Sequence, residues 1–155
     1  MGRIETRMKE LGLELPPPWT PRGAFLPYTK EGSFVFLSGQ ICEWDGVVTH
    51  RGPVGPGGLS VEDAQAAARV CALALLHTLK TACEGDLDRV RRVLRVGGFV
   101  NCTPGFADTP LVLNGATQIF IDVFGEAGRH ARTSVGVAGL PANAAVEADA
   151  IVLID

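Results

Sequence analysis

The sequence has few of the features by which several protein classes are recognised. Fourteen Lys and Arg stand against 17 acidic residues, giving a net charge of −3, and they form no basic stripe that could follow a phosphate backbone. The longest apolar run, Val70–Leu76, is much shorter than the roughly 20 residues that span a bilayer. Residues 1–19 also lack the apolar segment of a signal peptide. We therefore expect a cytoplasmic protein that binds neither nucleic acid nor membranes.

Patterns for metals and phosphates are equally scarce. No GxxxxGK[ST] is present, and prolines interrupt the glycines of residues 52–58, so backbone N–H groups for a phosphate cradle are missing. The cysteines lie far apart without a CxxC, and the histidines lack metal-ligand spacing. These residues are Cys42, Cys71, Cys83, Cys102, His50, His77 and His130. We expect no metal, no organic cofactor and free, mostly buried thiols. Cys42 is interpreted as a core thiol rather than a site residue.

What the sequence does contain is the pattern of one α+β domain. Hydrophobic residues make up 46% and charged residues 20%, an ordinary globular balance. The patterns predict strands at 24–27, 33–41, 90–101, 133–138 and 145–154, long helices at 60–84 and 109–125, and a short helix at 3–12. The long-element order is ββαβαββ, which favours a mixed sheet with both long helices on one face. We divide the chain into an N-terminal helix and Pro-rich extension (1–19) and the main domain (20–155).

Local signals set the ends of these elements. Ser60 is placed to cap the first long helix, and Thr109-Pro110 to begin the second with a hydroxyl cap and a proline at the first position. The apolar run Phe34–Leu37 is typical of a strand buried on both faces. Residues 44–58, with five glycines and two prolines, are expected to form a long surface loop.

The last two strands carry the most informative polar residues. Alternation places Glu147 and Asp149 on one strand face, where a carboxylate needs a wet surface, a partner or a shifted pKa. Arg132 precedes the other strand, with Ser134 and Gly136 on the same side, and its guanidinium suits the bidentate binding of a small carboxylate. These residues alone leave two alternatives open: a structural Arg132–Glu147 ion pair, or a carboxylate site in which Glu147 orients water.

Four segments in order resemble the RidA/YjgF family of reactive-intermediate deaminases. The strongest is Ala131-Arg132-Thr133-Ser134-Val135-Gly136-Val137-Ala138-Gly139-Leu140-Pro141, continuing to Val146-Glu147-Ala148-Asp149-Ala150-Ile151. The others are Pro27-Tyr28, Ser38-Gly39-Gln40-Ile41 and Asn114. The segment Phe124–Arg132 is similar to a longer subgroup that contains F-G-E-A-G and G-R-H-A-R.

This resemblance implies a chorismate-mutase-like fold, a homotrimer and clefts between its subunits. It implies hydrolysis of small 2-imino acids to 2-oxo acids and ammonia without a cofactor. Arg132 would bind the substrate carboxylate, Glu147 would help position water, and Tyr28, Ser38, Asn114 and Ser134 would contribute to substrate binding.

Departures from the family pattern leave rival functions open. Ser134 stands where the archetypal deaminases have cysteine, and both the N-terminal extension and the loop at 44–58 could reshape the cleft mouth. A trimer that binds a 2-oxo acid without turnover is therefore the main alternative. A ribonuclease, which an older family label indicates, is disfavoured by the net charge.

Overall fold

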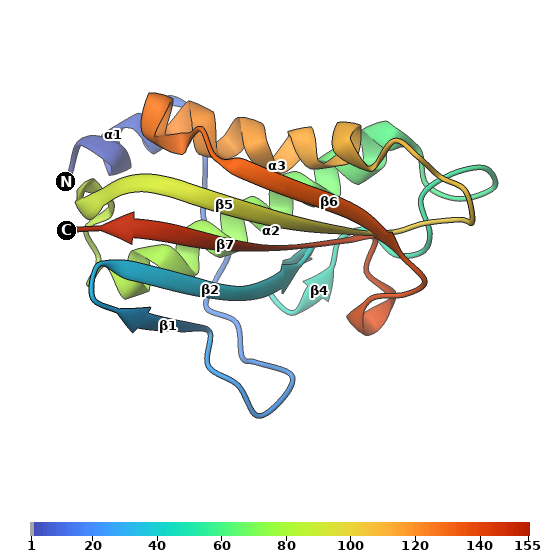
Figure 1. Ribbon diagram of the computed structural model, residues 1–155, viewed down its shortest axis with the longest axis horizontal. Helices are drawn as coiled ribbons and strands as arrows, with labels where there is room; N and C mark the ends of the chain where they lie inside the picture. Colours follow the sequence, from blue (N-terminus) through green and yellow to red (C-terminus); the bar gives the residue numbers. More distant parts are fainter. Residues whose placement is uncertain (1) are drawn as a thin grey trace.

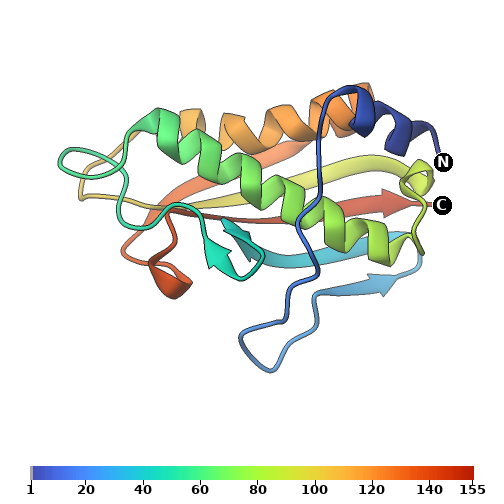
Figure 2. The same cartoon turned by 180° about the vertical axis from the view of Figure 1, so that it is seen from behind.

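A five-stranded mixed sheet forms one layer of the molecule, and two long helices cover one of its faces (Figures 1 and 2). The computed structural model describes residues 2–155. The strand order is β1-β2-β7-β5-β6, with β5 and β6 parallel and the other pairs antiparallel. Their bounds are β1 Tyr28–Glu31, β2 Phe34–Ile41, β5 Val90–Asn101, β6 Ala131–Val137 and β7 Val146–Ile154. The predicted α+β class and the order of its long elements are confirmed.

The covering helices are α2 (Val61–Ala82) and α3 (Thr109–Phe124), which pack against each other and against the sheet. Ser60 caps α2 as predicted, in a reciprocal capping box with Asp63. Gly115 of α3 lies so close to the backbone of α2 that a Cβ there would clash with the carbonyl of Gln65. This close approach brings α3 over the β5–β6 side of the sheet.

The start of α3 differs in detail from the prediction. Asp108 is its N-cap and makes no side-chain cap hydrogen bond, while Thr109 is already helical. The Thr109 hydroxyl instead donates to the Ser134 carbonyl at 3.3 Å. The residue expected to cap the helix therefore ties α3 to the edge strand β6.

The N-terminal segment packs on the same core as the rest of the chain. Helix α1 (Arg3–Glu10) buries Ile4 and Met8, and Asp88 accepts hydrogen bonds from the backbone N–H groups of Arg3 and Ile4 at 2.7 Å. The following extended segment crosses α2 on its way to β1, as Figure 2 shows. Trp19 is fixed against α2 because its indole N–H donates to the Thr78 hydroxyl at 3.0 Å.

Three local predictions differ from the structure, two in full and one in part. Residues 24–27 form no strand, and β1 begins at Tyr28 because its hydrogen-bonding partner is β2 residues 34–37. Residues 44–58 are mostly loop, as predicted, but β4 (Val47–Val48) forms a short hairpin with β3 (Glu43–Trp44), and Val54 is buried. Phe34 and Phe36 are 46% and 44% exposed, because the helices cover only the other face of β2.

No helix among residues 2–155 is long and apolar enough to cross a membrane.

Candidate functional site

Arg132 is held against α3 by neutral groups. Its Nη1 donates to Asn114 Oδ1 and to Thr117 Oγ1, each at 3.0 Å, and its Nη2 donates to the Pro110 carbonyl at 3.0 Å. Figure 1 shows why this is possible: β6 runs along the sheet edge beside α3. Two helix side chains and one helix carbonyl therefore fix the plane of the guanidinium.

This arrangement leaves Arg132 able to bind an anion. A guanidinium has five N–H donors, and the three hydrogen bonds leave Nε and one Nη2 hydrogen free. No carboxylate among residues 2–155 forms an ion pair with Arg132. Partial burial lowers the pKa of Arg132 below its usual value, although the group stays charged at neutral pH. A small carboxylate would supply the missing charge and accept the free donors.

A second layer of hydrogen bonds supports this arginine. His130 Nδ1 lies 2.7 Å from the Gly128 carbonyl and must donate to it, so the other nitrogen of a neutral ring accepts. That Nε2 lies 3.0 Å from Thr117 Oγ1, which thus accepts from Arg132 and donates to His130. Burial lowers the pKa of His130, and the charge of Arg132 lowers it further. The neutral histidine therefore fixes the orientation of the Thr117 hydroxyl.

Glu147 is the complementary group, a carboxylate without a partner. It lies on β7, half-buried, and forms neither a hydrogen bond nor an ion pair with the rest of the described chain. Burial raises the pKa of Glu147, and the charge of Asp149 raises it further. Gly39 packs against it, since a Cβ at that position would lie 3.0 Å from the Glu147 carboxyl carbon. A carboxyl with a raised pKa is a stronger base than an ordinary carboxylate and is therefore better suited to accepting and returning a proton.

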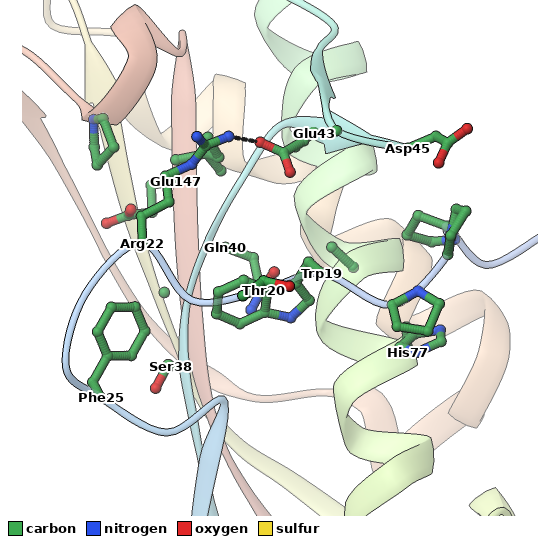
Figure 3. A pocket seen from close by; sticks show the side chains of 18 residues that line it. Trp19, Thr20, Arg22, Phe25, Ser38, Gln40, Glu43, Asp45, His77 and Glu147 are labelled. Carbon is green, nitrogen blue, oxygen red and sulfur yellow. Dashed lines mark hydrogen bonds and ion pairs between the residues drawn. The ribbon is translucent and has the colours of Figure 1, made fainter.

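Glu147 and Ser38 line a cavity of about 820 Å³ beside β2 (Figure 3). β1 pairs with β2 only as far as Leu37, so the second half of β2 is open to this cavity. The Ser38 hydroxyl donates to the Leu26 carbonyl at 2.6 Å, which leaves its oxygen free to accept. The N-terminal segment closes the other side with Pro16–Thr20, Arg22 and Phe25.

The remaining predicted residues divide between two regions. Asn114 contacts Arg132, and Ser134 follows it two positions along the same face of β6. Tyr28 begins β1 at the opposite edge of the sheet, packs on the core, and is not part of the cavity wall. Their binding roles stay predictions.

Within one chain, the structure keeps Arg132 and Glu147 apart. In register, Arg132 aligns with Val96 and Ala150, whose side chains are buried under the helices. Glu147 aligns with Phe99 on the face that the helices leave open. The two positions differ by three residues along the strands and by two strands, roughly 10 Å in each direction. The alternative of a structural Arg132–Glu147 ion pair within the chain is therefore wrong.

Sequence reasoning missed the residues that build the surroundings of both groups. Thr117 and Pro110 reach Arg132 because α3 packs on β6, and His130, two residues before Arg132, supports it through Thr117. Gln40 lay within a recognised segment but received no role, although it lines the cavity. Cys42 is buried as expected; its thiol lies 3.3 Å from the His50 carbonyl, and burial raises the pKa of nearby Cys71.

Comparison with known proteins decides the family. The family model described as YjgF/chorismate mutase-like, putative endoribonuclease, matches residues 5–149. The chain belongs to the RidA/YjgF family. The match begins within α1, so it includes most of the N-terminal segment.

Individual relatives agree with this assignment. Protein TCP17 of Trypanosoma cruzi is 43% identical over 97% of this chain and 94% of its own length. A solved Agrobacterium tumefaciens protein of unknown function is 45% identical, with a TM-score of 0.91 over 98% of this chain and 92% of its own. A Shewanella oneidensis structure named as a putative endoribonuclease is 31% identical, with a TM-score of 0.93 over 99% and 100%. The RidA/YjgF fold expected from the sequence is thus confirmed.

Proposed function

We propose that this RidA/YjgF protein hydrolyses small 2-imino acids to 2-oxo acids and ammonia, in clefts between the subunits of a homotrimer. The observation that carries the proposal is Arg132: a charged, oriented guanidinium with free donors and no anionic partner among residues 2–155. A substrate carboxylate is the group that this geometry accommodates best.

The chemistry requires little more than positioning. A protonated imine is already electrophilic, so fixing its carboxylate beside an ordered water supplies mainly proximity. Glu147 accepts a proton as the water oxygen bonds to C2, giving a carbinolamine. It then returns the proton to the carbinolamine nitrogen. As the C–N bond breaks and the C=O bond forms, Glu147 takes the hydroxyl proton and passes it to the departing ammonia, which leaves as ammonium beside the 2-oxo acid. The carboxylate of Glu147 is regenerated, and no metal or cofactor takes part in these steps.

A second copy of the chain supplies what one copy lacks. Arg132 lies on the β6 edge, whereas Glu147 and Ser38 border the cavity beside β2, toward the other edge. A cyclic trimer repeats the same contact three times and places one edge of each subunit beside the other edge of the next. The exposed Phe34 and Phe36 on the uncovered sheet face provide apolar surface for such an assembly.

The test is imine hydrolysis by wild type and Arg132→Ala. An amino-acid oxidase generates 2-imino acids from alanine and 2-aminobutanoate, and semicarbazide traps the imine that remains. Wild type should reduce semicarbazone formation, while Arg132→Ala should lower kcat/KM by about 100-fold or more. Arg129→Ala is the matched control, because Arg129 is exposed and pairs with Glu126.

Two results would change the assignment. Equal curves for wild type and a no-protein control would contradict turnover. If 2-oxo acids then raised the melting temperature of wild type but not of Arg132→Ala, the protein would be a carboxylate-binding member of the family. Activity that survives in Arg132→Ala would show that the anchor is wrongly assigned.

A further inference from the structure

The cavity beside β2 contains a buried amide without a hydrogen-bond partner. Gln40 is 4% exposed, and its Nε2 is buried with no partner among the described residues. Leaving a buried N–H donor unpaired is costly, so such a group is expected to meet a ligand or water. Gln40 lines the cavity together with Ser38 and Glu147 of the proposed active site (Figure 3). The amide therefore marks a second point of contact for a molecule bound there.

Flat, apolar side chains from the N-terminal segment enclose the space around this amide. Trp19 and Phe25 line it, with ring centroids 6.2 Å apart, and Pro16, Pro17 and Pro18 continue the wall. Trp19 is fixed by its bond to Thr78, whereas Phe25 is 47% exposed and lies at the cavity wall. Aromatic and proline surfaces of this kind favour a planar, apolar partner.

The charges around the cavity exclude one class of occupant. Within the described part of the chain, the lining carboxylates Glu147 and Asp45 have no cationic partner, and the lining arginine Arg22 is paired with Glu43. A side chain with a negative charge would be repelled here. A cationic side chain carries only donors and cannot accept from Gln40 Nε2. The remaining choice is a neutral side chain that has both a planar apolar part and a hydrogen-bond acceptor.

We propose that this cavity is the side-chain subsite of the active site, and that it selects 2-imino acids whose neutral aromatic side chain has an acceptor for Gln40 Nε2. The inference rests on the proposed function for the reaction itself. The cavity volume, about 820 Å³, falls within the range of small-molecule sites and exceeds what a methyl side chain would fill. The 4-hydroxyphenyl group of a tyrosine-derived imine meets both conditions, and the phenyl group meets only the first.

The experiment compares kcat/KM for imines derived from alanine, phenylalanine and tyrosine. Wild type should prefer the two aromatic imines to the alanine imine by about 10-fold, from the added apolar contact. It should prefer the tyrosine imine to the phenylalanine imine by about 5-fold, from one hydrogen bond. Gln40→Met should abolish the second preference, and Phe25→Ala, at an exposed position that tolerates change, should reduce the first.

Leu26→Ala is the matched control, because Leu26 is 64% exposed beside Phe25 and does not line the cavity. If the alanine imine is hydrolysed in an Arg132-dependent way but aromatic imines are no faster, the subsite is wrong and the proposed function stands. If wild type, Gln40→Met and Phe25→Ala all showed the same substrate preferences, the subsite would likewise be wrong and the proposed function would stand.

A binding measurement separates the two proposals if no imine is hydrolysed. In a Trp44→Phe background, Trp19 is the remaining tryptophan and reports on the cavity. 3-(4-Hydroxyphenyl)propionate should quench its fluorescence with a Kd about 5-fold below that of 3-phenylpropionate. That difference should vanish in Gln40→Met. Equal Kd values in wild type, or no saturable quenching, would overturn the subsite.

Discussion

The two sides of the sheet differ in how completely their functional side chains are satisfied. On the β6 side, Arg132 is held by three hydrogen bonds and by a second layer through Thr117 and His130. On the β2 side, neither Glu147 nor the buried Gln40 Nε2 has a partner among residues 2–155. One side holds an arginine in a fixed orientation, and the other is a cavity lined by polar groups without partners in the described chain. Under the proposed function, Arg132 binds the carboxylate that all substrates share, whereas the groups of the cavity carry out the proton transfers and select the side chain.

The largest expected effect separates binding from turnover. Arg132→Ala should weaken the binding of a 2-oxo acid by about 100-fold, because it removes a bidentate charged contact. Glu147→Gln should lower kcat by about 100-fold through loss of proton transfer. It should change the Kd for a 2-oxo acid by no more than about threefold. Calorimetric titration and the semicarbazide assay measure the two quantities. Equal loss of binding in both variants would contradict the division of roles.

Loosening the anchor without removing it should have an intermediate effect. Thr117→Val removes an acceptor of Arg132 and the donor to His130, so kcat/KM should fall by about 10-fold. Thr117→Ser keeps the hydroxyl and should retain most of the activity, which makes it the control. If valine and serine behaved alike, the second layer of hydrogen bonds would have no part in orienting Arg132.

The pH dependence should follow the carboxyl beside the cavity. Because burial and Asp149 raise the pKa of Glu147, kcat/KM should fall with falling pH at a point above the ordinary carboxyl range. Asp149→Asn removes a like charge and should move this limb to lower pH. If the fall of kcat/KM at low pH did not move in Asp149→Asn, or persisted in Glu147→Gln, a group other than Glu147 would cause it.

The same carboxyl should reduce stability at neutral pH. Native Glu147 holds its proton more tightly than the unfolded chain does, so its contribution is fully present below the unfolded pKa. That contribution is lost as pH rises through the folded pKa. Glu147→Gln should therefore raise the melting temperature at pH 7 and have less effect at pH 4. A variant less stable than wild type at pH 7 would contradict this reading.

The smallest expected effect concerns the packing against Glu147. A methyl group at Gly39 would approach the Glu147 carboxyl closely enough to displace it by a few tenths of an ångström. Gly39→Ala should lower kcat by about threefold to tenfold, because the water-positioning group moves. Gly139→Ala is the matched control, because its methyl group would lie in open space. Gly12→Ala would not serve, because the positive φ of Gly12 strains any other residue. Unchanged kcat in Gly39→Ala would show that Glu147 tolerates the shift.

The sequence was most informative where local chemistry decides structure. Ser60 with Asp63, and the helix-terminating Gly125 after Phe124, set the long helices correctly because caps act over a few residues. The first strand was predicted at residues 24–27 and begins at Tyr28, because its start is decided by pairing with β2 and not by local sequence signals. Arg132 and Glu147 were recognised from family motifs. Their separation depends on β5 lying between β6 and β7 and on the register of both pairings, which spacing along the chain does not reveal.

The most direct test of the split site mixes two inactive variants. Arg132→Ala and Glu147→Gln chains are unfolded together in equal amounts, refolded and assayed with the alanine imine. If each cleft takes Arg132 from one chain and Glu147 from its neighbour, about a quarter of the clefts in a random mixture have both residues. The account predicts recovery of about a quarter of wild-type activity. A mixture no more active than the two variants assayed separately would show that both residues act from the same chain, and would contradict it.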